Sequence, residues 1–286
     1  MPVNPLDMAR ARELRSREFV MDVMPTSSSP TEGAEYWRAR ARKVGHTGWK
    51  QPVLYAYDQR QRLRMLEQRL RVLGLPAHAR VLDFGCGTGD FSRLLLRLGF
   101  DVVGYDPYLA PQLTHPRFSY LGSPEAFSEL QGNFALVLSV TVLDHVLEPS
   151  AFAATLARLR ALAAPGGKLL ALEYAPDEEA PSPAPHQAYR SLPTWRAALP
   201  SAGWELTAHW PVPHPVHAPS QAFKTYRGSL LTRAVNRGTR YKLLEPATTW
   251  ALGALAQRAL DTSGDDQPIQ SPLKLMYCSA VEREPP

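Results

Sequence analysis

A glycine-rich loop behind a short apolar run is the part of the sequence best suited to chemistry. The run VLDF is followed by Gly85, Gly87 and Gly89, and then by the helical stretch DFSRLLLRLG. Glycine accepts a positive φ and lets a backbone approach a ligand closely. The free N–H groups at the start of a helix can hold an anionic ligand group. The loop therefore predicts a ligand-binding turn between a strand and a helix.

The spacing of the glycines separates two classes of ligand. A dinucleotide-binding loop reads G-x-G-x-x-G, which would require a glycine at residue 90, but the sequence has Asp90. A carboxylate there opposes a pyrophosphate at the same helix end, whereas S-adenosylmethionine (SAM) has no phosphate. Asp106 follows seventeen residues after Gly89 and can accept both ribose hydroxyl protons, a contact that both ligand classes share. The glycine spacing therefore favours SAM over NAD as the ligand of this loop.

The elements that must position these residues alternate along the chain from residue 79 onward. Strand-like runs are expected at 79–84, 101–107, 117–122, 133–140, 168–174, 204–212 and 273–282, with helical stretches at 90–99, 150–167 and 194–203. Such alternation implies right-handed crossovers and a mostly parallel sheet with helices on both faces. Residues 31–75 and 214–270 also have helical character, and 1–30 predicts a short helix followed by a tether.

With these elements in place, the sequence resembles class I SAM-dependent methyltransferases. VLDFGCGTG is similar to their motif I, FALVLSVTVLDHVLEP to their fourth strand and its loop, and ALAAPGGKLLALEY to the element leading into their fifth strand. The resemblance implies an α/β, Rossmann-like fold. Its mostly parallel sheet would have seven strands with helices on both faces, the last strand antiparallel, an N-terminal helical lid, and a helical insertion before the last strand.

Four segments follow from this interpretation. Residues 1–75 form the N-terminal tail and helical lid, 76–213 the SAM-binding core, 214–270 the insertion, and 271–286 the last strand of the core and the tail. The insertion is expected to be an acceptor cap or a homodimer contact. An apolar wall on it would consist of Leu230, Leu231, Val235, Trp250, Leu252 and Leu255.

The resemblance also implies roles for individual residues. Asp83, Gly85 and Gly87 would surround the methionine end of SAM, Cys86 would pack inside the loop, and Gly89 would let the helix pack. Asp106 would hold the ribose, Pro107 or Tyr108 would flank the adenine, and Ser139 would lie under the methionyl part. Ser123 stands where the family often has an acid that accepts from the adenine amino group, and Pro124 after it has no N–H to donate.

The loop after the fourth expected strand carries the candidate catalytic pair, Asp144 and His145. The carboxyl edge of an open α/β sheet is where ligands bind. A histidine has a pKa near neutrality, so His145 could accept the proton of a hydroxyl nucleophile. The alternative is that Asp144 and His145 shape the loop or pack against the cofactor.

Aromatic residues are concentrated in the N-terminal lead-in. Tyr36, Trp37, Trp49 and Tyr57 are candidate acceptor-binding residues that would close over SAM, since aromatic faces also suit a sulfonium cation. Tyr55 belongs to the same group, and the neighbouring Asp58 and Gln59 could bind polar groups of a ligand. Alternatively, the aromatic rings pack the N-terminal helices onto the core.

Composition restricts the classes of partner. The net charge is +5, with the excess in residues 1–80, but no consecutive basic run or RNA-binding signature occurs, so no nucleic-acid partner is expected. No stretch of eighteen apolar residues and no signal-peptide pattern occur, which predicts a cytoplasmic protein without a membrane partner. Two cysteines exclude a cysteine zinc site, and the His209, His214 and His217 cluster is interpreted as a surface loop, so no metal is expected.

These observations predict a methyltransferase for a small-molecule acceptor, with O-methylation of a metabolite or natural product favoured. N- or C-methylation of a small molecule, methylation of RNA or protein, and a non-catalytic SAM-binding subunit are the alternatives.

Overall fold

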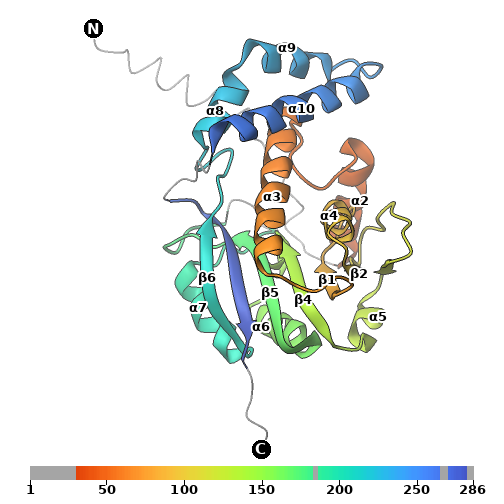
Figure 1. The fold of residues 1–286 in the computed structure, drawn as a ribbon, viewed down its shortest axis with the longest axis vertical. Helices are drawn as coiled ribbons and strands as arrows, with labels where there is room; N and C mark the ends of the chain where they lie inside the picture. The colour runs from red at the N-terminus through yellow and green to blue at the C-terminus, as the bar shows by residue number, and fades with distance from the viewer. Residues whose placement is uncertain (1–29, 183–185, 265–269, 282–286) are drawn as a thin grey trace, which may run out of the picture.

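A seven-stranded sheet forms the centre of the protein (Figure 1). The structure is a computed structural model that describes residues 30–182, 186–264 and 270–281, so the helix and tether expected before residue 30 lie outside the described residues. The strands are β1 (Arg80–Phe84), β2 (Asp101–Tyr105), β3 (Phe118–Leu121), β4 (Phe134–Val140), β5 (Ala163–Tyr174), β6 (Trp204–Pro211) and β7 (Leu273–Ala280).

The strand order is β3-β2-β1-β4-β5-β7-β6. Strands β1 to β5 pair in parallel, and β7 runs antiparallel to both of its neighbours, β5 and β6. This confirms the expected Rossmann-like sheet with an antiparallel last strand. The direction of the crossovers reverses between β1 and β4, and ligands of open α/β sheets bind at such a point, beyond the carboxyl ends of the strands.

Helices cover both faces of the sheet, as alternating side chains of the buried strands require. The helices α5 (Pro124–Glu129), α6 (Pro149–Leu162) and α7 (Leu192–Ser201) cover one face, where Leu82 packs with Leu156 and Trp195. The helices α3 (Pro52–Val72) and α4 (Asp90–Arg97) cover the other, where Val81 packs with Leu66 and Leu94. Neighbouring strand residues thus bury their side chains in two separate cores.

A second helical layer stands on the first part of α3. The helices α8 (Gln221–Gly228), α9 (Leu230–Gly238) and α10 (Glu245–Ser263) form the predicted insertion, and Figure 1 shows them together at the top of the molecule. Tyr57 of α3 packs there with Phe223 and Tyr226 of α8 and Ala256 of α10. No helix of the described residues is long and apolar enough to cross a membrane.

The helix expected over 150–167 ends at Leu162, so the end predicted for it was wrong. Pro165 and the two glycines after it cannot continue the helix, and β5 already begins at Ala163, which pairs with Phe134 of β4. Gly166 takes a φ of +66° in this turn. The short helices α5 and η1 (Leu143–His145) were not predicted from the sequence.

Candidate active site

A cavity of about 440 Å³ lies beyond the carboxyl ends of β1, β2 and β4, within the ~300–1,000 Å³ typical of ligand sites. One wall comes from these strand ends and the other from the N-terminal segment 36–62. The predicted site residues on its lining are Tyr36, Trp37, Trp49, Gly85, Cys86, Gly87, Asp106, Pro107, Tyr108 and His145. Residues widely spaced in the sequence therefore share one chamber.

The glycine loop is shaped by the absence of side chains. Gly85 has a φ of +75°, and a Cβ on it would collide with the side chain of Val142, so any larger residue would push away the loop after β4. Gly87 has a φ of +52°, and a Cβ there would make only an ordinary contact with Thr47, at 3.7 Å. The first glycine permits close packing of the two loops, and the second leaves room for a ligand.

Asp106 anchors the loop to the end of β2. Its Oδ2 accepts a hydrogen bond from the Gly87 N–H at 3.0 Å, and its Oδ1 accepts from the N–H groups of Tyr108 and Leu109, both at 2.9 Å. Burial raises the pKa of Asp106, while the three N–H donors act in the opposite direction. The carboxylate lines the cavity beside the loop, where it can accept hydroxyl protons of a ligand.

Three predicted cofactor-binding residues do not line the cavity. Two of them flank the glycine loop, and the third follows β3. Asp83 is buried beneath the loop and accepts a hydrogen bond from Ser92 Oγ at 2.6 Å, and burial raises its pKa to about 7. Gly89 caps α4 in the left-handed region, and Ser123 caps α5 by accepting from the Ala126 N–H. Their contacts to a ligand remain predictions.

Three further predicted residues, Tyr57, Ser139 and Asp144, are buried behind the lining. The hydroxyl of Tyr57 pairs with Ser220 Oγ at 2.8 Å, on the side of α3 that faces the insertion. A role of Tyr57 in holding an acceptor, and of Ser139 beneath the methionyl part, likewise remains a prediction.

His145 projects from the η1 turn toward the cavity. Its Nδ1 lies 2.8 Å from the backbone carbonyl oxygen of His186, which can only accept, so Nδ1 carries the proton. Its Nε2 lies 3.7 Å from Oδ1 of Asp144, too far for a hydrogen bond. That Oδ1 is buried and has no hydrogen-bond partner in the described residues, whereas Oδ2 accepts from Gln187.

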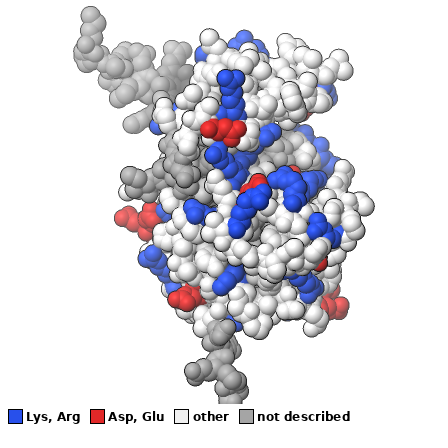
Figure 2. All heavy atoms as spheres, viewed as in Figure 1, with Lys and Arg blue, Asp and Glu red and all other residues white. Residues whose placement is uncertain are grey.

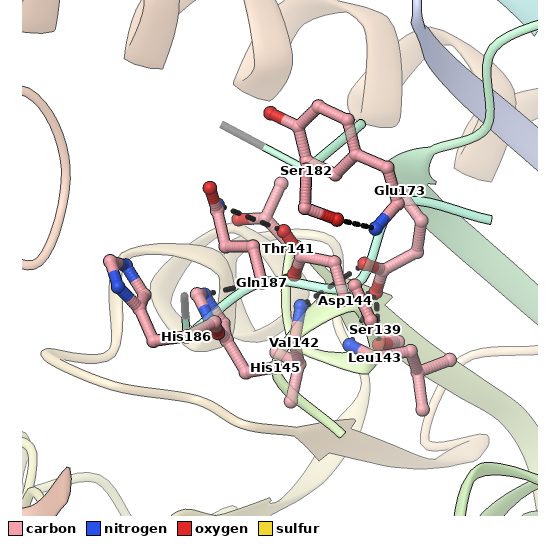
Figure 3. Close-up of polar contacts among 12 residues, drawn as sticks. Ser139, Thr141, Val142, Leu143, Asp144, His145, Glu173, Ser182, His186 and Gln187 are labelled. Atoms are coloured by element: carbon pink, nitrogen blue, oxygen red, sulfur yellow. Dashed lines mark hydrogen bonds and ion pairs between the residues drawn. The ribbon is translucent and has the colours of Figure 1, made fainter. Parts of the chain in front are cut away.

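Glu173, which was not predicted from the sequence, supports the loop that carries this pair (Figure 3). Its carboxyl group at the end of β5 accepts from the N–H groups of Val142 and Leu143 and from the hydroxyl of Ser139. Burial, and secondarily the neighbouring Asp144, raise the pKa of Glu173 to about 8. A charged residue at the end of the apolar run LLALEY was the only sequence signal for this role.

The N-terminal segment closes over the pair from the other side. The helix α2 (Pro30–Val44) carries Trp37, whose ring lies edge-on to His145 at 5.1 Å between centroids, and Tyr36, whose ring lies 5.5 Å from His186. Arg38 Nε donates to the carbonyl of Tyr108 at 3.1 Å. The lead-in therefore touches both the candidate base and the segment after β2.

A buried ion pair on α3 forms the inner end of this wall. Arg62 contacts Asp58 Oδ2 at 2.9 Å, and the indole N–H of Trp49 donates to the same oxygen at 2.8 Å. Asp58 Oδ1 and Arg62 Nε are both buried without a hydrogen-bond partner in the described residues. Asp58 was a polar candidate from the sequence, but Arg62 was not, because in YDQRQRLRML it looks like any exposed helix arginine.

No described residue of the insertion lines this cavity. Leu230, Leu231 and Trp250 are exposed, and Leu252 is buried, so the apolar wall expected over an acceptor is not formed there.

His214 is buried rather than on a surface loop. Its Nε2 pairs with the hydroxyl of Tyr174 at 2.8 Å, and its ring stacks on His217. The surface-loop interpretation of the histidine cluster was therefore wrong for His214.

The residues present fit SAM. The glycine loop offers a side-chain-free approach at Gly87, the buried carboxylate of Asp106 suits ribose hydroxyls, and the aromatic rings around His145 suit a cationic sulfur. Asp90 also lines the cavity at the start of α4, where its carboxylate would repel a pyrophosphate.

Comparison with known proteins agrees with this geometry. The family model for a methyltransferase domain (Methyltransf_23) matches residues 55–234, more than half of the chain. The chain is 28% identical over 145 residues to the ubiquinone biosynthesis O-methyltransferase of Bradyrhizobium diazoefficiens, covering 48% of this chain and 56% of that protein. It is 37% identical over 120 residues to the protein of that name from Xanthomonas axonopodis pv. citri, covering 38% and 46%. The chain thus spans about half the length of the curated relatives it matches.

Solved structures show the same fold. The 1,6-didemethyltoxoflavin-N1-methyltransferase of Burkholderia thailandensis, solved with S-adenosylhomocysteine, aligns with a TM-score of 0.52 at 20% identity, covering 90% of this chain and 92% of that chain. The phosphoethanolamine N-methyltransferase 2 of Haemonchus contortus aligns with a TM-score of 0.51 at 17% identity, covering 87% and 57%. The chain belongs to the methyltransferase domain family, and it has the Rossmann-like fold of these solved methyltransferases.

Proposed function

We propose that the protein is an O-methyltransferase that transfers the methyl group of SAM to a hydroxyl of a small aromatic acceptor, with His145 as the general base. The observation that carries this proposal is the position of His145. It lies on the same cavity as the glycine loop and Asp106, with its Nδ1 proton fixed on the His186 carbonyl. The Nε2 lone pair is thereby left to accept a proton.

Asp144 supports the base through charge. When Nε2 takes a proton, the imidazolium lies 3.7 Å from the buried Oδ1 of Asp144, which has no hydrogen-bond partner in the described residues. An unpaired buried carboxylate oxygen is costly, and a nearby positive ring offsets that cost. His186 is a poorer base, since burial and the neighbouring His145 lower its pKa to about 4.

The remaining wall residues align the reactants. Bound SAM supplies an electrophilic methyl group on a sulfonium whose departure needs no proton. The glycine loop and Asp106 would fix its position, and Trp37 and Tyr36 would exclude water and hold a flat acceptor against His145. We place the reaction in the cytoplasm. The curated relatives that the chain matches are named O-methyltransferases, which supports a hydroxyl acceptor.

Replacing His145 by alanine tests the proposal. Radiolabelled SAM and a panel of phenolic acceptors would identify a substrate, and His145→Ala should then lower kcat by about 10²–10⁴-fold, as loss of a general base does. Affinity for SAM, measured by calorimetry, should stay within about twofold, because the loss falls on the proton transfer and not on binding. The matched control is His209→Ala, since His209 contacts Arg196 outside the cavity.

Unchanged kcat in His145→Ala would remove the base assignment. Turnover of amines but of no hydroxyl acceptor by the wild type would replace O-methylation by N-methylation, for which alignment suffices without a base.

A further inference from the structure

Exposed apolar side chains gather on α9, on the 239–244 connection and on the start of α10. Six of the eight large apolar side chains that are exposed in the described residues lie between 230 and 250. Leu243 is 97% exposed, Leu230 77% and Trp250 74%. The full set is Leu230, Leu231, Tyr241, Leu243, Leu244 and Trp250, which we call the α9–α10 face. Such a concentration marks an interaction site.

Positive charge surrounds these side chains. Arg233, Arg237, Arg240 and Lys242 are all exposed, and none forms an ion pair with another described residue. No Asp or Glu occurs between Glu205 and Glu245, and Glu245, which is exposed beside Leu244, is the one acidic residue in 230–250. Figure 2 shows blue basic groups at the upper edge of the molecule, where Figure 1 places α9.

The helix α9 is arranged to present this chemistry outward. Leu230, Ala234 and Arg237 follow one another at helical spacing on one side and are exposed, while Thr232 on the opposite side is buried. The inner side packs onto the layer formed with α10, so the apolar and basic side chains are left to an outside partner.

The charge favours one partner over two others. A symmetric homodimer through this face would bring the same four cations of each copy together, which opposes association. A nucleic acid would satisfy the cations but would leave Leu243 and Trp250 without an apolar partner. An anionic bilayer satisfies both kinds of side chain, since its headgroups attract Lys and Arg and its acyl region takes apolar side chains.

We propose that the α9–α10 face docks the protein on the surface of an anionic lipid membrane, as a peripheral contact that spans nothing. This revises the expectation from composition that no membrane is a partner. The layer that carries the face packs on α3, whose Asp58 and Arg62 line the cavity, so docking would hold the active site close to the bilayer. The proposal does not depend on the identity of the acceptor.

Vesicle sedimentation tests the proposal without any turnover measurement. The full-length protein should bind vesicles of phosphatidylcholine mixed with phosphatidylglycerol, bind them less at high salt, and bind phosphatidylcholine alone weakly. Arg237→Gln with Arg240→Gln should weaken binding about 30-fold, at ~1 kcal/mol for each lost charge. The matched control, Arg42→Gln with Lys43→Gln, removes the same charge from the exposed end of α2 and should change binding little.

A second pair of variants tests the apolar part. Leu243→Ser with Leu244→Ser should weaken binding at least about tenfold, whereas Val72→Ser, which changes an apolar side chain that is 80% exposed elsewhere, should not. These residues are exposed, so folding should survive, and thermal melting would check it.

Three results would overturn the proposal. The first is that the wild-type protein does not bind anionic vesicles at low salt. The second is a homodimer that Leu243→Ser with Leu244→Ser dissociates in light scattering, with vesicle binding unchanged. The third is RNA binding that depends on Arg237 and Arg240 while vesicle binding does not.

Discussion

The two walls of the cavity are built in different ways. The wall at the strand ends uses backbone, glycine and one carboxylate, so that Gly87 N–H and Asp106 meet at 3.0 Å across the β1 and β2 ends. The N-terminal wall uses large side chains, such as Trp37 against His145 and Trp49 against Asp58. We propose that the first wall, which is fixed by backbone contacts, binds the nucleoside of SAM and that the second selects the acceptor.

This contrast predicts that substitutions in the two walls have different effects on SAM affinity and on turnover of the acceptor. Sheet register fixes the position of the first wall, since Asp83 pairs with Gly104 and Phe84 with Ser139 across neighbouring strands. Side-chain packing on α2 and α3 fixes the second. Substitutions in the first wall should therefore change cofactor affinity, and substitutions in the second should change acceptor use.

Loss of the Asp106 side chain from the strand-end wall should weaken SAM binding strongly. Asp106→Ala removes the acceptor for ribose hydroxyls and for three backbone N–H groups, and SAM affinity should fall about 100-fold, as two charged hydrogen bonds would imply. Asp101→Ala is the control, because Asp101 starts the same strand at its far end. If calorimetry shows equal SAM affinity in the two variants, the first wall does not bind the ribose.

Trp37 in the N-terminal wall should show a smaller loss of a different kind. Trp37→Ala opens the wall beside His145 and should lower kcat/KM for the acceptor about tenfold, while the Kd for SAM changes by less than about twofold. Trp210→Ala provides the comparison, since Trp210 stacks on Arg69 outside the cavity. Equal losses of SAM affinity in Trp37→Ala and Asp106→Ala would mean that the walls do not have separate tasks.

The smallest expected effect is on the pH dependence of the free energy of unfolding. Burial raises the pKa of Glu173 from its ordinary 4.5 to about 8, so the folded protein keeps a proton that the unfolded chain releases in that interval. The free energy of unfolding should then fall as pH rises from about 4.5 to 8, and Asp83 adds to this fall between 3.8 and about 7. Glu173→Gln should flatten the decline.

Thermal melting across this pH range checks the sign. Glu205→Gln, at an exposed position on β6, is the control and should leave the decline as it is in the wild type. A melting temperature of the wild type that rises with pH over the interval, or that Glu173→Gln does not alter, would contradict the placement of a buried carboxyl beneath the His145 loop.

The strand-end wall could be predicted from the sequence because its signals are local. Glycine spacing, the following helix and the acid after the second strand all lie within a short run, and the strand–helix alternation indicates a mostly parallel sheet. The positions of Gly85 and Asp106 in that wall therefore match those that spacing alone indicated.

The second wall could be predicted only in part. The aromatic content of the lead-in was visible, but whether Tyr57 faces the cavity or the α8–α10 layer depends on which side of α3 each partner covers. The roles of Glu173 and Arg62 could not be predicted, because they depend on burial and on partners that are distant in the sequence. From the sequence alone, a single charged residue in a helix or at a strand end is expected to be exposed. Leu230 and Trp250 were expected in an apolar wall that the insertion would form over the acceptor, but both side chains are exposed.

Calorimetry of SAM binding to Gly87→Arg and Gly166→Arg decides whether the glycine loop holds the cofactor. Both glycines have a positive φ, and a Cβ on either would meet no atom closer than 3.7 Å, so the backbone cost is similar, but only Gly87 faces the cavity. We predict that Gly87→Arg abolishes detectable SAM binding and that Gly166→Arg binds SAM as the wild type does. Retained SAM affinity in Gly87→Arg, with both variants folded, would contradict the assignment of the site.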